Sequence, residues 1–122
     1  MKLEIVAGNI ESAIAAQLGE ADRVELCDHL EVGGTTPSTG TIEAVRKIFT
    51  GGLHVMIRPR GGDFIYSEDE FETMKRDIET CKQLHVDGVV FGILSADGSV
   101  DKIRTAQLVH LAKIEYYSLL SN

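Results

Sequence analysis

The sequence has no long apolar segment and little positive charge. None of its hydrophobic runs approaches the roughly 20 residues needed to span a bilayer. The first run, over residues 3–7, contains Glu4, which is foreign to the core of a signal peptide. The 12 Lys and Arg residues against 19 Asp and Glu give a net charge of -7, which repels nucleic acid and anionic membranes. We therefore expect a cytoplasmic protein with neither a nucleic-acid nor a membrane partner.

Cysteines and linkers are also scarce. The only two cysteines, Cys27 and Cys81, are expected to remain thiols in the cytoplasm, as core residues, nucleophiles or ligands of a soft metal. No Pro- or Ser-rich linker interrupts the chain. The loop at residues 6–9 has no glycine-rich G-x-G-x-x-G motif, and this argues against a dinucleotide site there.

The chain does contain a repeated pattern of short apolar runs, each followed by apolar residues at helical spacing. These runs cover residues 3–6, 23–26, 53–57 and 88–91. Nearly continuous apolar runs with β-branched residues are typical of parallel strands covered by helices. Right-handed crossovers would place such strands side by side in chain order. The pattern predicts the α/β class, with four parallel βα units forming half of a TIM-type β/α barrel.

Local signals indicate where the helices begin. Asn9 is placed to cap the first helix, and Ser67 and Glu70 have the spacing of a capping box at the start of the third. The last helix can be capped by either Ser99 or Asp101. The capping box gives the clearest helix start in the chain.

Polar residues gather toward the carboxyl ends of the predicted strands, where β/α barrels carry their reactive groups. Alternation along a strand directs Glu4, Glu25 and Cys27 into the barrel, and Arg58 ends the third strand. A buried carboxylate is costly unless it is paired. We expect these residues at the inner mouth, either as an ion network or as a site in which Glu25 and Glu4 act as acid or base.

The segment at residues 58–64 combines two arginines with a proline and a pair of glycines. Guanidinium groups bind carboxylates and phosphates, and glycines can turn their amides toward an anion. The sequence therefore predicts an anion site formed by Arg58, Arg60 and Asp63 for a small carboxylate or phosphate. The alternative is that Arg60 and Asp63 only fasten the loop to its own backbone.

Cys27 and His29 form a second candidate site. If the chain stays extended after the second strand, the thiol and the imidazole project the same way, and this donor pair suits Cu(I) or Zn(II). The alternative is a packed thiol beside a surface histidine. Cys81 lies in the apolar stripe of a predicted helix, so we expect it to be a core residue.

Four motifs follow one another along the chain: ADRVELC at 21–27, GGTTPS at 33–38, IRPRGGDFIYS at 57–67 and DGVVFG at 87–92. Together they resemble the CutC copper-homeostasis family. The resemblance implies a TIM-type barrel, a cytosolic location and Cu(I) binding or trafficking, with Cys27 as the family's cysteine at the end of the second strand. Members often carry another cysteine near the end of the first strand, where this chain has Val6 and Ala7.

The resemblance covers about residues 2–113, and we interpret residues 1–113 as the half-barrel domain. The tail, residues 114–122, departs from the family as a truncation would leave it. Open outer strands invite pairing with another chain. We therefore expect a homo-oligomer in which two copies complete the barrel, or a tail whose Tyr116 and Leu119 cover an edge. Copper handling, an enzyme acting on a small anionic molecule, and a truncated product without activity of its own all remain open.

Overall fold

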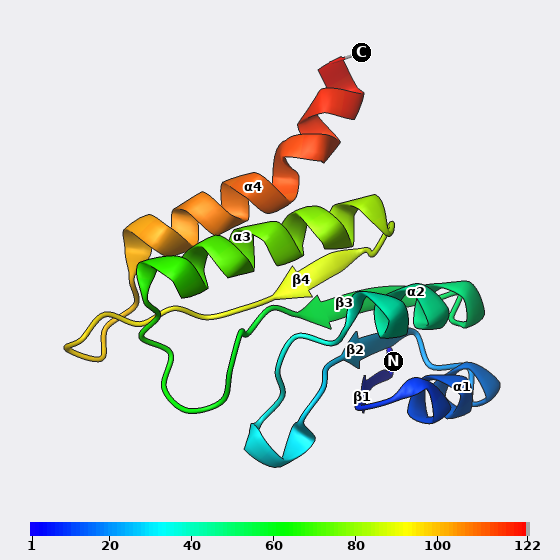
Figure 1. Ribbon diagram of the computed structural model, residues 1–122. Coiled ribbons are helices and arrows are strands. Elements are labelled where there is room, and N and C mark those ends of the chain that lie inside the picture. The colour runs from blue at the N-terminus through cyan, green and yellow to red at the C-terminus, as the bar shows by residue number, and fades with distance from the viewer. Residues whose placement is uncertain (122) are drawn as a thin grey trace.

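The computed structural model describes residues 1–121, with side chains placed for residues 1–113. In chain order the elements are β1 (Glu4–Ala7), α1 (Ile10–Leu18), β2 (Arg23–Leu26), the 3-10 helix η1 (Leu30–Val32), α2 (Thr39–Ile48), β3 (Gly52–Met56), α3 (Glu68–Gln83), β4 (Gly88–Val90) and α4 (Lys102–Ser121). Strands and helices alternate along the whole fold (Figure 1). The tail side chains, Tyr116 and Leu119 included, lie outside the described part.

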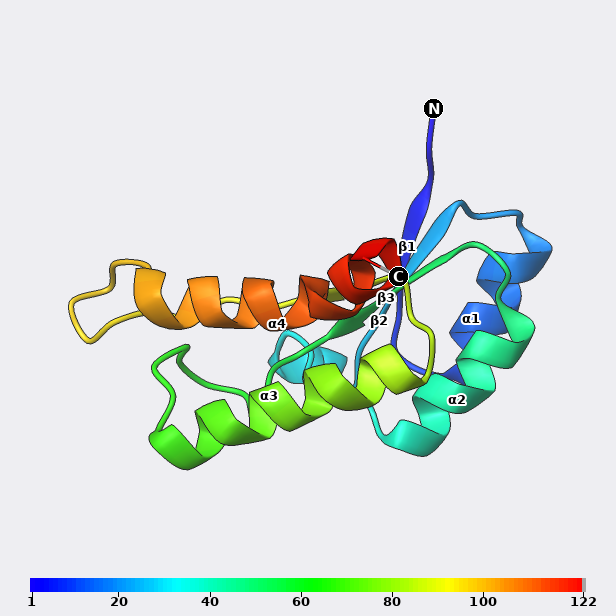
Figure 2. The same cartoon turned by 90° about the horizontal axis from the view of Figure 1, so that it is seen from above.

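The four strands form one parallel sheet in the order β1-β2-β3-β4. Neighbouring helices pack in two pairs, α1 with α2 and α3 with α4, as the view from above shows (Figure 2). This arrangement confirms the predicted α/β class and the half of a TIM-type barrel. No helix in the described part of the chain is both long and apolar enough to cross a membrane.

The core lies between the helices and the outer face of the sheet. The strands contribute Val24 and Leu26 from β2 and Leu53 and Val55 from β3, all fully buried. The helices add Ile42, Val45, Met74, Ile78 and Leu108. Each such side chain contributes about 1.5–3 kcal/mol through its burial. Cys81 belongs to this core, as predicted from its place in the apolar stripe of α3.

The other face of the sheet, which we call the inner face, carries Val6, Glu25, His54 and Met56. Val6 pairs with Glu25 and Glu25 with His54, so these three form one row across β1, β2 and β3. In a closed barrel this face would line the interior. Here Val6 on this face is 52% exposed.

The helix starts agree with the signals in the sequence. Asn9 accepts a hydrogen bond of 2.8 Å from an amide in the first turn of α1. Ser67 and Glu70 make both hydrogen bonds of the capping box at α3. Asp101 accepts from a first-turn amide of α4 at 3.1 Å, so it provides the cap for which Ser99 was the other candidate.

Candidate functional site

Cys27 lies directly after β2, at the carboxyl end of the inner face, and only 2% of it is exposed. Its Sγ lies 3.9 Å from the carbonyl oxygen of Ala7. A Cβ on Gly34 would lie 3.3 Å from Cys27 Sγ and 3.5 Å from the methyl carbon of Met56. The Cys27 thiol and the Met56 methyl group, which come from the ends of neighbouring strands, therefore both lie close to Gly34.

The surroundings of Cys27 are electronegative. Burial raises the pKa of the Cys27 thiol, and the charges of Glu25 and Asp28 raise it further. Negative charges that disfavour a thiolate favour a bound cation at the same place. Cys27 also lines a cavity of about 240 Å³ with Gly8 and Asn9, between the ends of β1 and β2.

His29 does not accompany Cys27. Its backbone is left-handed, with φ 48° and ψ 57°, so the chain is not extended there. The imidazole Nδ1 lies 3.1 Å from Thr35 Oγ1, and 59% of the side chain is exposed. The predicted pair depended on an extended chain, and the turn at His29 removes that basis. Within the described residues, no group of three or more His, Cys, Asp and Glu side chains could hold a metal ion.

Arg58 is buried at the end of β3 and joins two loops. Nη1 donates to the carbonyl oxygens of Val32, at 2.7 Å, and Gly34, at 3.0 Å. Nη2 donates to that of Gly62 at 2.8 Å. These bonds tie the loop between β2 and α2 to the loop between β3 and α3. Arg58 forms no ion pair with any carboxylate in the described residues, and its Nε has no hydrogen-bond partner.

Arg60 and Asp63 fasten their own loop, as the alternative to anion binding proposed. Arg60 makes five hydrogen bonds, two to Glu70 and three to carbonyl oxygens of residues 61, 63 and 65. A guanidinium has five N–H donors, so none remains for a ligand. Asp63 accepts from the Ile65 amide at 3.1 Å and pairs with Arg60. Of the three residues predicted to bind an anion, Arg58 alone keeps a free donor.

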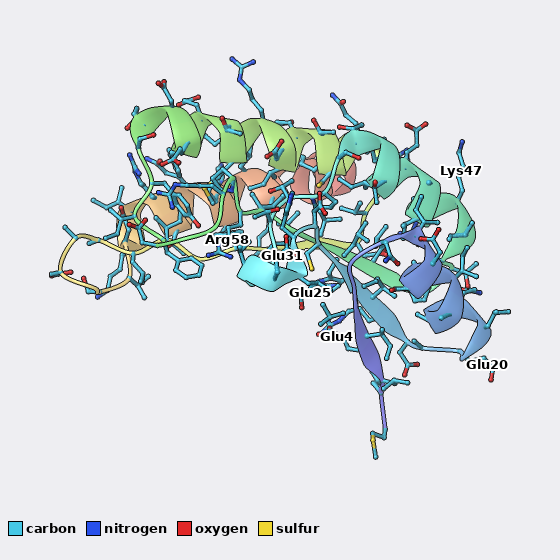
Figure 3. All side chains as sticks on the ribbon, turned by 60° about the horizontal axis from the view of Figure 1, so that its bottom comes forward. Glu4, Glu20, Glu25, Glu31, Lys47 and Arg58 are labelled. Carbon is cyan, nitrogen blue, oxygen red and sulfur yellow. The ribbon has the colours of Figure 1, made fainter. Side chains whose placement is uncertain are left out.

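Glu4 and Glu25 lie at different heights on the inner face, along the line that leads to Arg58 (Figure 3). Glu4 starts β1 and forms an ion pair with Arg23, its partner at the start of β2. The starts of parallel strands lie at the end of the barrel opposite its mouth. The prediction that Glu4 lies at the mouth is therefore wrong. Glu25 lies two residues before Cys27 on the same face, so it lies near the mouth.

Two residues of this region were not singled out as site residues in the sequence. Met56 ends β3 on the same face as Arg58, a placement that strand alternation could have revealed. Tyr66 is 5% exposed, and its hydroxyl has no hydrogen-bond partner. Only the fold shows that the loop returns Tyr66 to the end of β3, because the path of that loop depends on the bonds of Arg58 and Arg60.

Comparison with known proteins agrees with this fold. The family model described as the CutC family matches residues 1–116. A CutC family protein of Chromobacterium violaceum is 57% identical over 110 residues, which are 90% of this chain and 44% of the relative. The human copper homeostasis protein cutC homolog is 50% identical over 100 residues, 82% of this chain and 37% of that protein.

The fold has a solved counterpart as well. The crystal structure of CutC from Streptococcus agalactiae has a TM-score of 0.85 and 37% identity, and the match covers 93% of this chain and 56% of that one. The chain thus spans less than half the length of the curated relatives named above. The family model, the relatives and the solved structure agree, and the chain belongs to the CutC family.

Proposed function

We propose that this chain binds Cu(I) through Cys27 and Met56 and acts in copper homeostasis. The observation that carries the proposal is that Cys27 Sγ and the Met56 methyl carbon both lie within 3.5 Å of the place where a Cβ on Gly34 would be. Soft sulfur ligands select Cu(I) over harder cations. Membership of a family in which the human relative is named a copper homeostasis protein supports the same function. Met56 replaces His29 as the second proposed ligand beside Cys27.

The environment of the two sulfur atoms suits a monovalent cation. Glu25 and Asp28 place negative charge close enough to raise the pKa of the Cys27 thiol. Burial keeps water and competing thiols away from the bound ion. Because binding displaces the thiol proton, Cu(I) affinity should increase as the pH rises.

An anaerobic Cu(I) titration against a chromogenic chelator tests the proposal. We expect Cys27→Ser to lower the affinity by at least about tenfold and Met56→Leu to lower it by about threefold or more, since each removes a soft donor. Cys81→Ala is the matched control, because that thiol lies on the core face of α3 and its loss should leave Cu(I) affinity unchanged. Equal affinities of Cys27→Ser and the wild type would contradict the proposal.

We also propose that the protein works in the cytoplasm, because the Cu(I) site requires Cys27 as a thiol. Both cysteines are free in this fold, as expected in a reducing compartment. Cell fractionation of the tagged chain tests this directly. Recovery from the membrane or secreted fraction in place of the cytoplasmic one would contradict it.

Self-association of the half-barrel is a further part of the proposal. β1 and β4 are the outer strands of the described sheet. Beside β1 lies an apolar cavity of about 330 Å³, lined by Leu3, Ile5, Val6 and neighbouring residues of α1. Strand edges and apolar surfaces of this kind pair with a partner, and a second copy would supply four more strands.

Sedimentation at micromolar concentration tests this association. We expect twice the mass of the 13.3 kDa chain for the wild type and a shift toward monomer for Val6→Lys. Val100→Lys is the control, since Val100 is 55% exposed, close to the 52% of Val6, but lies ahead of α4. A folded wild-type monomer would rule out the association.

A further inference from the structure

A third cavity opens at the carboxyl ends of β3 and β4. It measures about 240 Å³, and its lining includes Met56, Arg58, Phe64, Tyr66, Val90 and Gly92. Cys27 is not part of this lining, so the cavity is separate from the Cu(I) proposal apart from Met56. A Cβ on Gly92 would meet no atom within 4 Å, so there is free space on that side.

Arg58 brings an uncompensated positive charge to this cavity. It is 6% exposed, and its three hydrogen-bond acceptors are all neutral carbonyl oxygens. A buried charge without a counter-ion is costly, so buried charges are normally paired. The guanidinium carbon lies 4.7 Å from the centre of the Phe64 ring, which is a further favourable contact but not an anion. Nε–H remains a buried donor without an acceptor.

Tyr66 contributes a second donor of the same kind. Its hydroxyl is buried and has no partner in the described residues. Burial raises the pKa of Tyr66, whereas the positive charge of Arg58 and a polar contact with its guanidinium act against that rise. The phenol therefore stays protonated near neutral pH and can donate. Two buried donors thus share one cavity, and both need an acceptor.

We infer that this cavity binds a small carboxylate with an apolar body. Its oxygens would accept from Arg58 Nε and the Tyr66 hydroxyl, while its body lies against Phe64 and Val90. A carboxylate suits this site better than a phosphate because a phosphate dianion requires more donors than these two, and the remaining walls are largely apolar. The ligand also supplies a counter-ion, which Arg58 lacks among the side chains that the structure describes.

Ligand-observed and amide NMR of the metal-free chain, with a Cu(I) chelator present, tests this inference with benzoate as the probe. We expect benzoate to bind with a Kd on the order of 1 mM or better, which is ordinary for a fragment of this size. Benzamide, which has the same shape without the charge, should bind at least about tenfold more weakly. Inorganic phosphate should bind no better than benzamide. Absence of benzoate binding, or equal binding of benzamide or phosphate, would overturn the inference.

Two substitutions test whether benzoate binds in this cavity. Tyr66→Phe removes only the unpartnered hydroxyl, so the fold should persist while benzoate binds about tenfold more weakly. Gly92→Leu fills the free space and should abolish benzoate binding, and Gly40→Leu on the far surface of α2 is the control. Unchanged benzoate affinity in Gly92→Leu would contradict the assignment. Cu(I) affinity should survive Gly92→Leu, so this result is independent of the Cu(I) proposal.

Discussion

Arg60 and Glu70 form a two-point ion pair, with Nε 2.6 Å from Oε2 and Nη2 3.2 Å from Oε1. The same Glu70 carboxylate accepts the Ser67 amide at 2.8 Å and so completes the capping box of α3. One carboxylate therefore fixes both the start of a helix and the loop before it. That loop carries Arg58 and Tyr66 to the mouth, so the Arg60–Glu70 pair supports the proposed carboxylate cavity without touching its ligand.

This pair predicts an acid-sensitive stability. The hydrogen bond from Arg60 lowers the pKa of Glu70, and the Ser67 amide lowers it further. A lowered pKa means that the stability from Glu70 is present above its unfolded value of about 4.5 and is lost as the pH falls through the folded value. Urea unfolding followed by circular dichroism should show the midpoint of the wild type falling between about pH 5 and pH 3. The urea midpoint of Glu70→Gln should be lower than that of the wild type at pH 7 and should change less between about pH 5 and pH 3.

The control for this experiment is Glu72→Gln on the same helix. Glu72 pairs with Lys75 at 2.7 Å, but the pair is exposed to solvent. Exposed pairs of this kind contribute little, about 0–1 kcal/mol, so the urea midpoint should hardly change. Parallel pH profiles of Glu70→Gln and the wild type would show that the Arg60–Glu70 pair does not carry the effect.

Gly34 should tolerate no side chain. Its φ is +97°, a conformation that L residues rarely adopt, and a Cβ there would press against Cys27 Sγ at 3.3 Å. We expect Gly34→Ala to lower the free energy of unfolding by about 1–3 kcal/mol and to weaken Cu(I) binding. Gly40→Ala in α2 is the matched control, which should be neutral or stabilise by up to about 1 kcal/mol. Thermal unfolding of both variants gives the comparison, and equal stability of the two would contradict the strain at Gly34.

The fold could be predicted from the sequence because its signals are local and agree with one another. The apolar run at residues 23–26 coincides with β2, and the capping box at Ser67 marks the start of α3. Parallel order then follows from the handedness of βα crossovers. Errors at strand ends were one residue or so, as for β1, which begins at Glu4 and not at residue 3.

The site was less predictable because it depends on contacts between loops. Glu4 was assigned to the correct face but to the wrong end, since face follows from alternation whereas height depends on register. His29 follows a strand in sequence, yet its left-handed turn is imposed by the bonds between Asp28 and Thr35. Arg60 is used within its own loop, and Arg58 keeps a free donor. Both facts depend on where the fold places the carbonyl and carboxylate acceptors of the loops, which the sequence does not give.

The two thiols should differ in reactivity, although neither should react readily. Burial raises the pKa of Cys81 to about 12, and it also raises that of Cys27. Because the thiolate is the nucleophile, iodoacetamide at about pH 8 should alkylate both more slowly than in the urea-unfolded chain. Cys27, which lines a cavity, should react before Cys81 within the core. Peptide mass spectrometry over time measures both rates, and faster labelling of Cys81 would contradict the burial described here.

The two inner-face glutamates should act differently on the Cys27 thiol. Glu25 is among the charges that raise the pKa of Cys27, so Glu25→Gln should lower that pKa and speed alkylation of Cys27 at neutral pH. Glu4→Gln is the matched change, but Glu4 is paired with Arg23 at the opposite end of the strands and should leave the rate unchanged. At a pH high enough for the Cys27 thiol to be ionised in both variants, the same comparison predicts weaker Cu(I) binding for Glu25→Gln alone, because a negative charge near the cation is lost. If Glu4→Gln changed the alkylation rate of Cys27 as strongly as Glu25→Gln does, the charge at the first residue of β1 would act on the thiol. The placement of the site at the carboxyl ends of the strands would then be incorrect.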